Sequence, residues 1–208
     1  KFLLEKSEFN AGPNSFSNCA KLTQITIPTS ITSIGNSAFL NCKSLIKVVI
    51  PSSVTHIESF AFANCTLLKE IHISSSIIDI GNNAFENCCS LEEIEIPPQL
   101  KFIRSCLFLD CSSLKSISIP PSVTYIGTYA FDSCVSLKEI KIPSSVKEIQ
   151  FFAFRKCSSL EEIYIPSSVT VFGKFLFNQC KELKKITIPH FVHLKSLGID
   201  WELKKEFI

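Results

Sequence analysis

Cysteine recurs every 23 residues along this chain, and this period constrains the fold more than any other feature of the sequence. The eight periodic positions are Cys19, Cys42, Cys65, Cys88, Cys111, Cys134, Cys157 and Cys180. Phenylalanine keeps the same step at Phe16, Phe39, Phe62, Phe85, Phe108, Phe131, Phe154 and Phe177. A fixed period of about 20 to 50 residues is typical of a solenoid, in which each repeat packs only on its neighbours. We therefore expect one elongated domain.

The repeat reads L-x-x-I-x-I-P-x-S-V-x-x-I-G-x-x-A-F-x-x-C-x-x and runs without a gap from Leu22 to Glu182. Its first six positions alternate apolar and polar residues, as at Ile140 and Ile142, which predicts a half-buried strand. The proline that follows lacks an N–H and ends the strand. A second apolar pair, such as Val123 and Ile126, predicts a second short strand.

Two further features complete the expected coil. Glycine occupies the corner after the second strand in every other repeat, at Gly35, Gly81, Gly127 and Gly173, and this pattern predicts a positive φ there. The segment from Ala38 to Cys42 is expected to form a single helical turn, with its apolar residues on one face.

This pattern resembles the leucine-rich repeats of the BspA-like family, found in surface proteins of bacteria and protozoa, and the resemblance covers residues 22 to 189. It implies an α/β repeat solenoid that is right-handed, with short strands plus one helical turn in each coil. It also implies adhesion or protein recognition, and it supplies no catalytic residues. The more familiar leucine-rich pattern carries asparagine just after the strand, whereas this position is mostly serine here, so no continuous asparagine ladder is expected.

The ends of the chain depart from the repeat. We expect a degenerate N-terminal repeat or cap at 1–21, the solenoid at 22–189, and a C-terminal cap or the start of the next segment at 190–208. Asp200 is suited to be the N-cap of a helix beginning at Trp201. Because the chain begins with Lys1 rather than methionine, we expect a fragment or a processed form.

The charges are nearly balanced, with 21 basic and 19 acidic residues and a net charge of +2. This balance argues against binding of nucleic acid or of an anionic membrane surface. The sequence holds no run of 18 apolar residues, the length of a membrane span.

The periodic cysteines are interpreted as buried thiols that serve as small apolar side chains. Neighbouring thiols of such a ladder are within disulfide reach, but a bridge would distort a regular stack. No C-x-x-C pair is present, so no metal site is predicted. Cys89 and Cys106 lie off the ladder and are the better candidates for exposed, reactive thiols. The cysteine count leaves the redox compartment undecided.

Candidate binding residues come from the third and fifth repeat positions, whose side chains point away from the core. The selected residues are Glu70, His72, Glu93, Glu95, Glu139, Lys141, Glu162 and Tyr164. A basic partner or a divalent cation could dock on the acidic members, and the alternative interpretation is a charged, solvated sheet face. A second candidate is an aromatic patch, which is either a partner site or the margin of the core, formed by Phe102, Tyr125, Tyr129, Phe152 and Phe175.

No phosphate-binding loop, dinucleotide fingerprint or nucleophile motif is present, so neither an enzyme nor a cofactor is predicted. We expect a cell-surface or secreted recognition module that binds a host or matrix protein. The alternative is a cytoplasmic structural scaffold that docks on a larger assembly. The glycosylation motif Asn64-Cys65-Thr66 is interpreted as chance, because Cys65 falls on the buried ladder.

Overall fold

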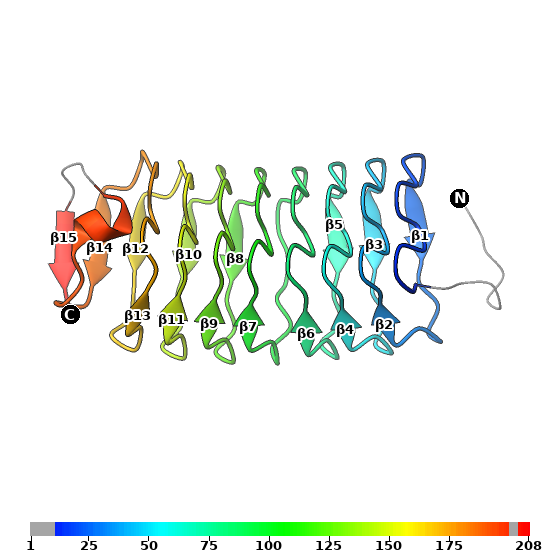
Figure 1. The fold of residues 1–208 in the computed structure, drawn as a ribbon, viewed down its shortest axis with the longest axis horizontal. Helices are drawn as coiled ribbons and strands as arrows, with labels where there is room; N and C mark the ends of the chain where they lie inside the picture. Colours follow the sequence, from blue (N-terminus) through cyan, green and yellow to red (C-terminus); the bar gives the residue numbers. More distant parts are fainter. Residues whose placement is uncertain (1–10, 200–203) are drawn as a thin grey trace.

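The computed structural model describes residues 11–199 and 204–208 and shows a β-solenoid whose coils stack side by side along a rod (Figure 1). Each coil runs through a first strand, a second strand and a turn segment, such as residues 36–42, before it enters the next coil. The first strands are β1 (Gln24–Thr26), β3 (Lys47–Val49), β5 (Glu70–His72), β8 (Ser116–Ser118), β10 (Glu139–Lys141), β12 (Glu162–Tyr164) and β14 (Lys185–Ile188). The second strands are β2 (Ser33–Ile34), β4 (His56–Ile57), β6 (Asp79–Ile80), β7 (Phe102–Ile103), β9 (Tyr125–Ile126), β11 (Glu148–Ile149) and β13 (Val171–Phe172).

Paired strands are parallel and in register by one repeat, so that Gln24 lies opposite Lys47, which in turn lies opposite Glu70. The predicted alternation decides which side chains enter the core. Ile140 and Ile142 are each 5% exposed, whereas Glu139 and Lys141 between and beside them face solvent. The outward residues of the first strands, together with those of residues 91–97, form a surface that we call the strand face.

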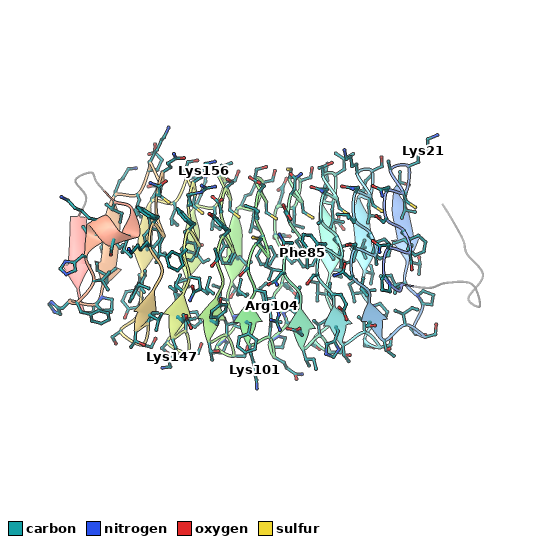
Figure 2. All side chains as sticks on the ribbon, in the orientation of Figure 1. Lys21, Phe85, Lys101, Arg104, Lys147 and Lys156 are labelled. Carbon is teal, nitrogen blue, oxygen red and sulfur yellow. The ribbon has the colours of Figure 1, made fainter. Side chains whose placement is uncertain are left out.

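The phenylalanine column fills the centre of the rod. Its rings stack nearly parallel, with neighbouring centroids 5.1 to 5.9 Å apart from Phe16 to Phe177. Phe131 is fully buried, as the repeat register requires. Figure 2 shows Phe85 within the rod, while Lys101 and Lys147 extend away from it. Apolar burial is therefore continuous along the rod rather than divided into separate cores.

The expected helical turn is wrong, because the turn segment alternates hydrogen bonds within a coil and between coils. The Cys42 N–H donates to the Phe39 carbonyl of its own coil at 3.1 Å, but the Phe39 N–H donates to Ala61 of the next coil at 2.7 Å. Two residues of each turn segment have a left-handed backbone, which no α-helix contains. They are Asn14, Asn18, Ser37, Asn41, Phe60, Asn64, Asn83, Asn87, Cys106, Asp110, Tyr129, Ser133, Phe152, Lys156, Phe175 and Gln179.

The corner glycines are required for a reason other than the expected positive φ. In the described chain, Gly198 is the single glycine with a positive φ. A Cβ built on Gly127 would lie 2.5 Å from the backbone nitrogen of Ser105, and one on Gly173 would lie 2.1 Å from that of Phe151. Such distances are far below van der Waals contact, so these glycines allow close approach of the preceding coil.

The C-terminal end carries a short 3₁₀ helix, η1 (Leu194–Leu197), and a final strand, β15 (Lys204–Phe207). β15 pairs in parallel with β14, so a strand, not a helix, covers that edge of the sheet. The helix start expected at Asp200 and Trp201 lies outside the described residues, as does part of the predicted N-terminal cap. Within the described residues, no helix is long and apolar enough to cross a membrane.

Candidate recognition surface

All eight predicted binding residues are exposed on the strand face, and six of them line two hollows. Four of them surround a depression of about 310 Å³ that lies where β5 gives way to residues 91–97. They are Glu70, His72, Glu93 and Glu95. Lys69, together with Ser116 and Ser118 of β8, completes the polar part of the rim. We call this hollow the acidic depression.

Two of its carboxylates are available to a partner. Glu70 forms an ion pair with Lys47, and this hydrogen-bonded cation lowers the pKa of Glu70. Glu93 and Glu95 form no ion pair within the described chain. No three His, Cys, Asp or Glu side chains of the described residues converge as a metal site would require. The depression therefore offers negative charge on a broad surface rather than a cage for a cation.

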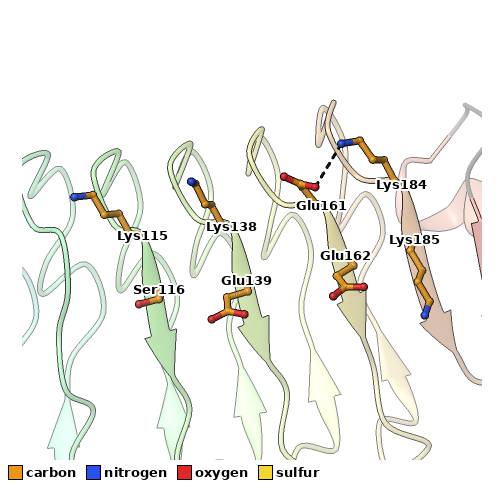
Figure 3. A pocket seen from close by; sticks show the side chains of 8 residues that line it. All are labelled: Lys115, Ser116, Lys138, Glu139, Glu161, Glu162, Lys184 and Lys185. Carbon is orange, nitrogen blue, oxygen red and sulfur yellow. Dashed lines mark hydrogen bonds and ion pairs between the residues drawn. The ribbon is translucent and has the colours of Figure 1, made fainter.

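The second hollow is a charged groove of about 670 Å³ across β8, β10, β12 and β14 (Figure 3). Glu139 and Glu162 line it beside Lys185, and Lys184 pairs with Glu161 at 3.4 Å along its upper rim. Exposed ion pairs of this kind add little stability and exchange partners readily. The groove thus presents both signs of charge, with lysine and glutamate in each of its two rows of side chains.

Lys141 and Tyr164 lie opposite each other on β10 and β12, next to the charged groove. Tyr164 is 52% exposed, which leaves its ring and hydroxyl open to solvent. Tyrosine at such a position combines apolar area with a hydrogen-bonding group, a combination enriched at protein interfaces. It is the one aromatic side chain among the predicted strand-face residues.

The predicted aromatic patch divides into two groups on different sides of the coil. Phe102 and Tyr125 meet edge to face on neighbouring second strands, with centroids 6.3 Å apart. Tyr129, Phe152 and Phe175 instead stack face to face in the turn segments, at 5.0 and 5.4 Å. We call these three the aromatic rail. Because each ring covers the face of the next, the rail presents mainly ring edges to solvent.

A buried ion pair holds the aromatic rail in place. Asp132 is 1% exposed and accepts two hydrogen bonds from Arg155, at 3.0 and 2.7 Å. The Arg155 guanidinium also lies 5.3 Å from the Tyr129 ring centre and 5.4 Å from that of Phe152. Its hydrogen bonds with Asp132 raise the pKa of Arg155. The rail is thus fastened by charge and by cation–π contact together.

The cysteines, all of which lie in the described part of the chain, are free thiols. Each buried ladder thiol donates to the carbonyl of the phenylalanine one coil earlier, as Cys134 does to Phe108 at 3.2 Å. Burial raises the pKa of the Cys42 and Cys180 thiols to about 12, so they remain protonated donors. Removal from water and use as a donor together make these thiols unreactive.

The two cysteines off the ladder are only partly exposed. Cys89 donates to Asn87, and burial, together with the charge of Glu86, raises the pKa of Cys106. The thiol with the greatest exposure is instead Cys19, at the N-terminal start of the ladder. It was missed because its sequence position matches the buried members, whereas within the described residues no preceding coil covers it or offers a carbonyl to accept from its thiol.

Sequence reasoning also missed a ladder of asparagine side chains, which lies in the turn segments rather than after the strands. Asn41 donates to Asn18 at 2.9 Å, Asn64 to Asn41 at 2.9 Å, and Asn87 to Asn64 at 2.8 Å. The signal was visible, since asparagine precedes four of the ladder cysteines. Asn64 therefore uses both ends of its amide inside the ladder, and Cys65 beside it is fully buried.

The comparisons with known proteins agree with this geometry. The model of the BspA type leucine rich repeat region matches residues 4–115 and 103–198, in six copies. The chain therefore belongs to the BspA-type leucine-rich repeat family. Solenoids of this class generally act as protein-binding modules rather than enzymes. A comparison with curated proteins gives no match.

Several solved bacterial structures are similar to this chain. A leucine-rich repeat protein of T. pallidum is 30% identical with a TM-score of 0.73, over 89% of this chain and 87% of that one. A leucine-rich cell surface protein of Faecalibacterium prausnitzii is 29% identical, with a TM-score of 0.60 over 93% of this chain and 62% of that one. The pneumococcal vaccine antigen PcpA is 26% identical, with a TM-score of 0.55 over 90% and 55%.

Proposed function

We propose that this chain is a non-catalytic recognition module of a cell-surface or secreted protein, and that its strand face binds a protein partner. The observation that carries the proposal is the contrast between the two sides of each first strand. The inward isoleucines hardly vary, whereas the outward residues differ from coil to coil and surround two hollows with unpaired or exchangeable charges. A surface location is supported by the neighbour described as a cell surface protein.

Within this face, charge complementarity favours a basic segment of the partner at the acidic depression. Glu93 and Glu95 supply two carboxylates that form no ion pair within the described chain, and three acidic side chains line the depression against one lysine, Lys69. Opposite charges steer association and fix the orientation of a complex. The charged groove beyond β8 then offers both lysines and glutamates to the remainder of the same partner.

Capture of partner proteins by the immobilised chain tests this proposal. Extracts of host cells and matrix are passed over the wild-type chain, over the E93K/E95K double variant and over an E58K control, which reverses an exposed charge away from the strand face. We expect the double variant to lose the captured protein and the control to keep it. Equal capture by a correctly folded double variant would remove the acidic depression from the binding surface.

A cytoplasmic scaffold is the second candidate, and the free thiols favour it, because disulfides are rare in reducing compartments. Protease treatment of intact source cells separates the two locations. Loss of the chain while cytoplasmic markers survive supports the surface module. Cleavage that occurs only after lysis supports the scaffold.

A further inference from the structure

Both parallel sheets of the rod end at the same boundary between two coils. On the strand face, β1, β3 and β5 form one sheet, and β8 belongs to the next. On the other side, β2, β4 and β6 form one sheet, and β7 begins another. Residues 91–97, which fill the first-strand position of the intervening coil, form no strand. We call the boundary between the coils 68–90 and 91–113 the seam.

Two side chains at the seam differ from those of most regular boundaries. In most regular coils the serine at the ninth repeat position donates to the previous coil, as Ser76 does to Val54 at 2.8 Å, and the exception is Ser145, which has no partner. The coil after the seam has Gln99 at this position, and its amide reaches only the Ser75 carbonyl at 3.5 Å. On the strand face, Glu93 follows Glu70 in the same column, and like charges at neighbouring strand positions are destabilising. Glu139 and Glu162 share this arrangement between the paired strands β10 and β12, so the glutamates act at the seam together with Gln99 rather than alone.

The turn side of the seam remains intact. The Phe85 N–H donates to Leu107 at 3.1 Å, and the Asn87 N–H donates to Leu109 at 2.7 Å. The Cys111 thiol donates across the seam to the Phe85 carbonyl at 3.2 Å. Even so, the ring centres of Phe85 and Phe108 are 5.9 Å apart, against 5.1 to 5.7 Å for the other neighbouring pairs of the column. The turn segments on the two sides of the seam are thus joined by hydrogen bonds, whereas the two strand sides lack strand pairing across it.

A single ion pair bridges the open second-strand side. Arg104 donates from two nitrogens to the two carboxylate oxygens of Asp79, at 3.0 and 3.1 Å. This bidentate geometry fixes orientation as well as distance, in contrast to the single contacts of the lysine pairs. Figure 2 places Arg104 near the middle of the rod, among the second strands.

We propose that the seam is a hinge at which the coils before Leu91 and the coils after it rotate about the shared turn side. Rotation opens or closes the two strand sides together, and the Asp79–Arg104 pair is the strap that limits opening. The acidic depression lies across the seam, so its width changes with this motion. The hinge follows from the hydrogen bonding of the chain alone and does not depend on a partner.

Hydrogen–deuterium exchange on the whole chain, read by mass spectrometry, tests the hinge. Peptides covering 70–80 and 93–103 flank the seam, and peptides covering 139–149 and 162–172 flank an intact boundary between later coils. We expect exchange at least about tenfold faster at the seam, the factor that corresponds to roughly 1.4 kcal/mol of local opening. Equal protection at the two boundaries would overturn the proposal.

Two variants distinguish a hinge, in which both strand sides open together, from a weakness confined to one strand side. R104Q cuts the strap on the second-strand side, and a hinge then predicts faster exchange at β5, on the strand face, as well as at β6 and β7. Q99S restores the serine donor and is expected to slow exchange at both sides. K184Q is the control, because it breaks an exposed ion pair away from the seam. An R104Q effect confined to β6 and β7 would refute coupled rotation.

Discussion

In the N-terminal half of the rod, the left-handed residue before each core cysteine is asparagine, whereas the C-terminal half has Asp110, Ser133, Lys156 and Gln179 there. The amides of the first set form a ladder, and the second set forms none that continues it. Asparagine tolerates a left-handed backbone, which costs most other residues roughly 1–2 kcal/mol. The C-terminal half adopts the same backbone without this relief.

The C-terminal half compensates at its other left-handed column, which holds the aromatic rail. Stacked rings contribute about 0.5–1.5 kcal/mol per pair, close to the conformational cost of their own positions. Both halves keep the same hydrogen bonds between turn segments, so the backbone conformation follows from the stacking of coils. The side chains only reduce its cost, by amides in one half and by rings in the other.

The largest expected effect is a loss of stability at alkaline pH. We expect it equally in both halves, because both contain the buried cysteines. Unfolded thiols ionise near pH 9, whereas burial raises the pKa of Cys42 and Cys180 to about 12 and that of the other ladder thiols upward as well. The ladder's stabilisation is therefore complete below pH 9 and is lost as the pH rises toward 12. In that window each buried thiol lowers the free energy of unfolding by up to about 1.4 kcal/mol per pH unit.

Circular dichroism against pH, with thiolate absorbance followed in parallel, measures this loss. We expect cooperative unfolding that coincides with thiolate formation in both halves. Replacing Cys134 and Cys157 by serine keeps the donors but removes two titrating groups, so alkaline unfolding should shift to higher pH. Gradual titration of the thiols in a chain that stays folded would contradict the ladder.

The second prediction compares a phenylalanine of the core column, which runs through both halves, with a ring of the aromatic rail, which lies in the C-terminal half. F131A empties a fully buried position and should lower the free energy of unfolding by about 3–5 kcal/mol. F152A removes two stacking contacts from a half-exposed ring and should cost about 1–3 kcal/mol. Urea denaturation of both variants gives the difference. Equal losses would mean that the rail belongs to the core.

The smallest effect tests the asparagine ladder. N64A loses two amide hydrogen bonds and a residue suited to the left-handed backbone, and should cost about 1–2 kcal/mol in urea denaturation. N64G keeps the backbone freedom and isolates the contribution of the hydrogen bonds. A larger loss in N64G than in N64A would show that backbone conformation is not what asparagine provides there.

The sequence predicts the core because its period places the same residue at the same depth in every coil, as Phe131 and Cys134 show. It mispredicts the turn segment, because alternate N–H groups there donate to carbonyls of the next coil. A pattern read within a single repeat does not show these carbonyl acceptors. The corner glycines carried a real signal, but close approach of Ser105 to Gly127 and a positive φ both call for the same residue.

The binding surface is predictable only in part, for a related reason. Which side chains point outward follows from the alternation, and Glu93 and Tyr164 are exposed as expected. Their grouping around two hollows depends on residues that lie outside the consensus, and one of the two hollows, the acidic depression, lies across the seam. The division of the aromatic candidates likewise depends on whether a ring lies in a strand, as Phe102 does, or in a turn segment, as Phe152 does.

The corner glycines also bear on how such a chain can lengthen by duplication. Gly35, Gly81 and Gly127 each precede a coil whose corner holds a long side chain, namely Glu58, Arg104 or Gln150. A corner glycine is needed wherever the backbone of the preceding coil comes too close for a Cβ. Removing one glycine coil would leave two long-cornered coils in direct succession. Duplications or deletions that preserve the alternation of corners from Gly35 to Gly173 therefore add or remove two coils at a time.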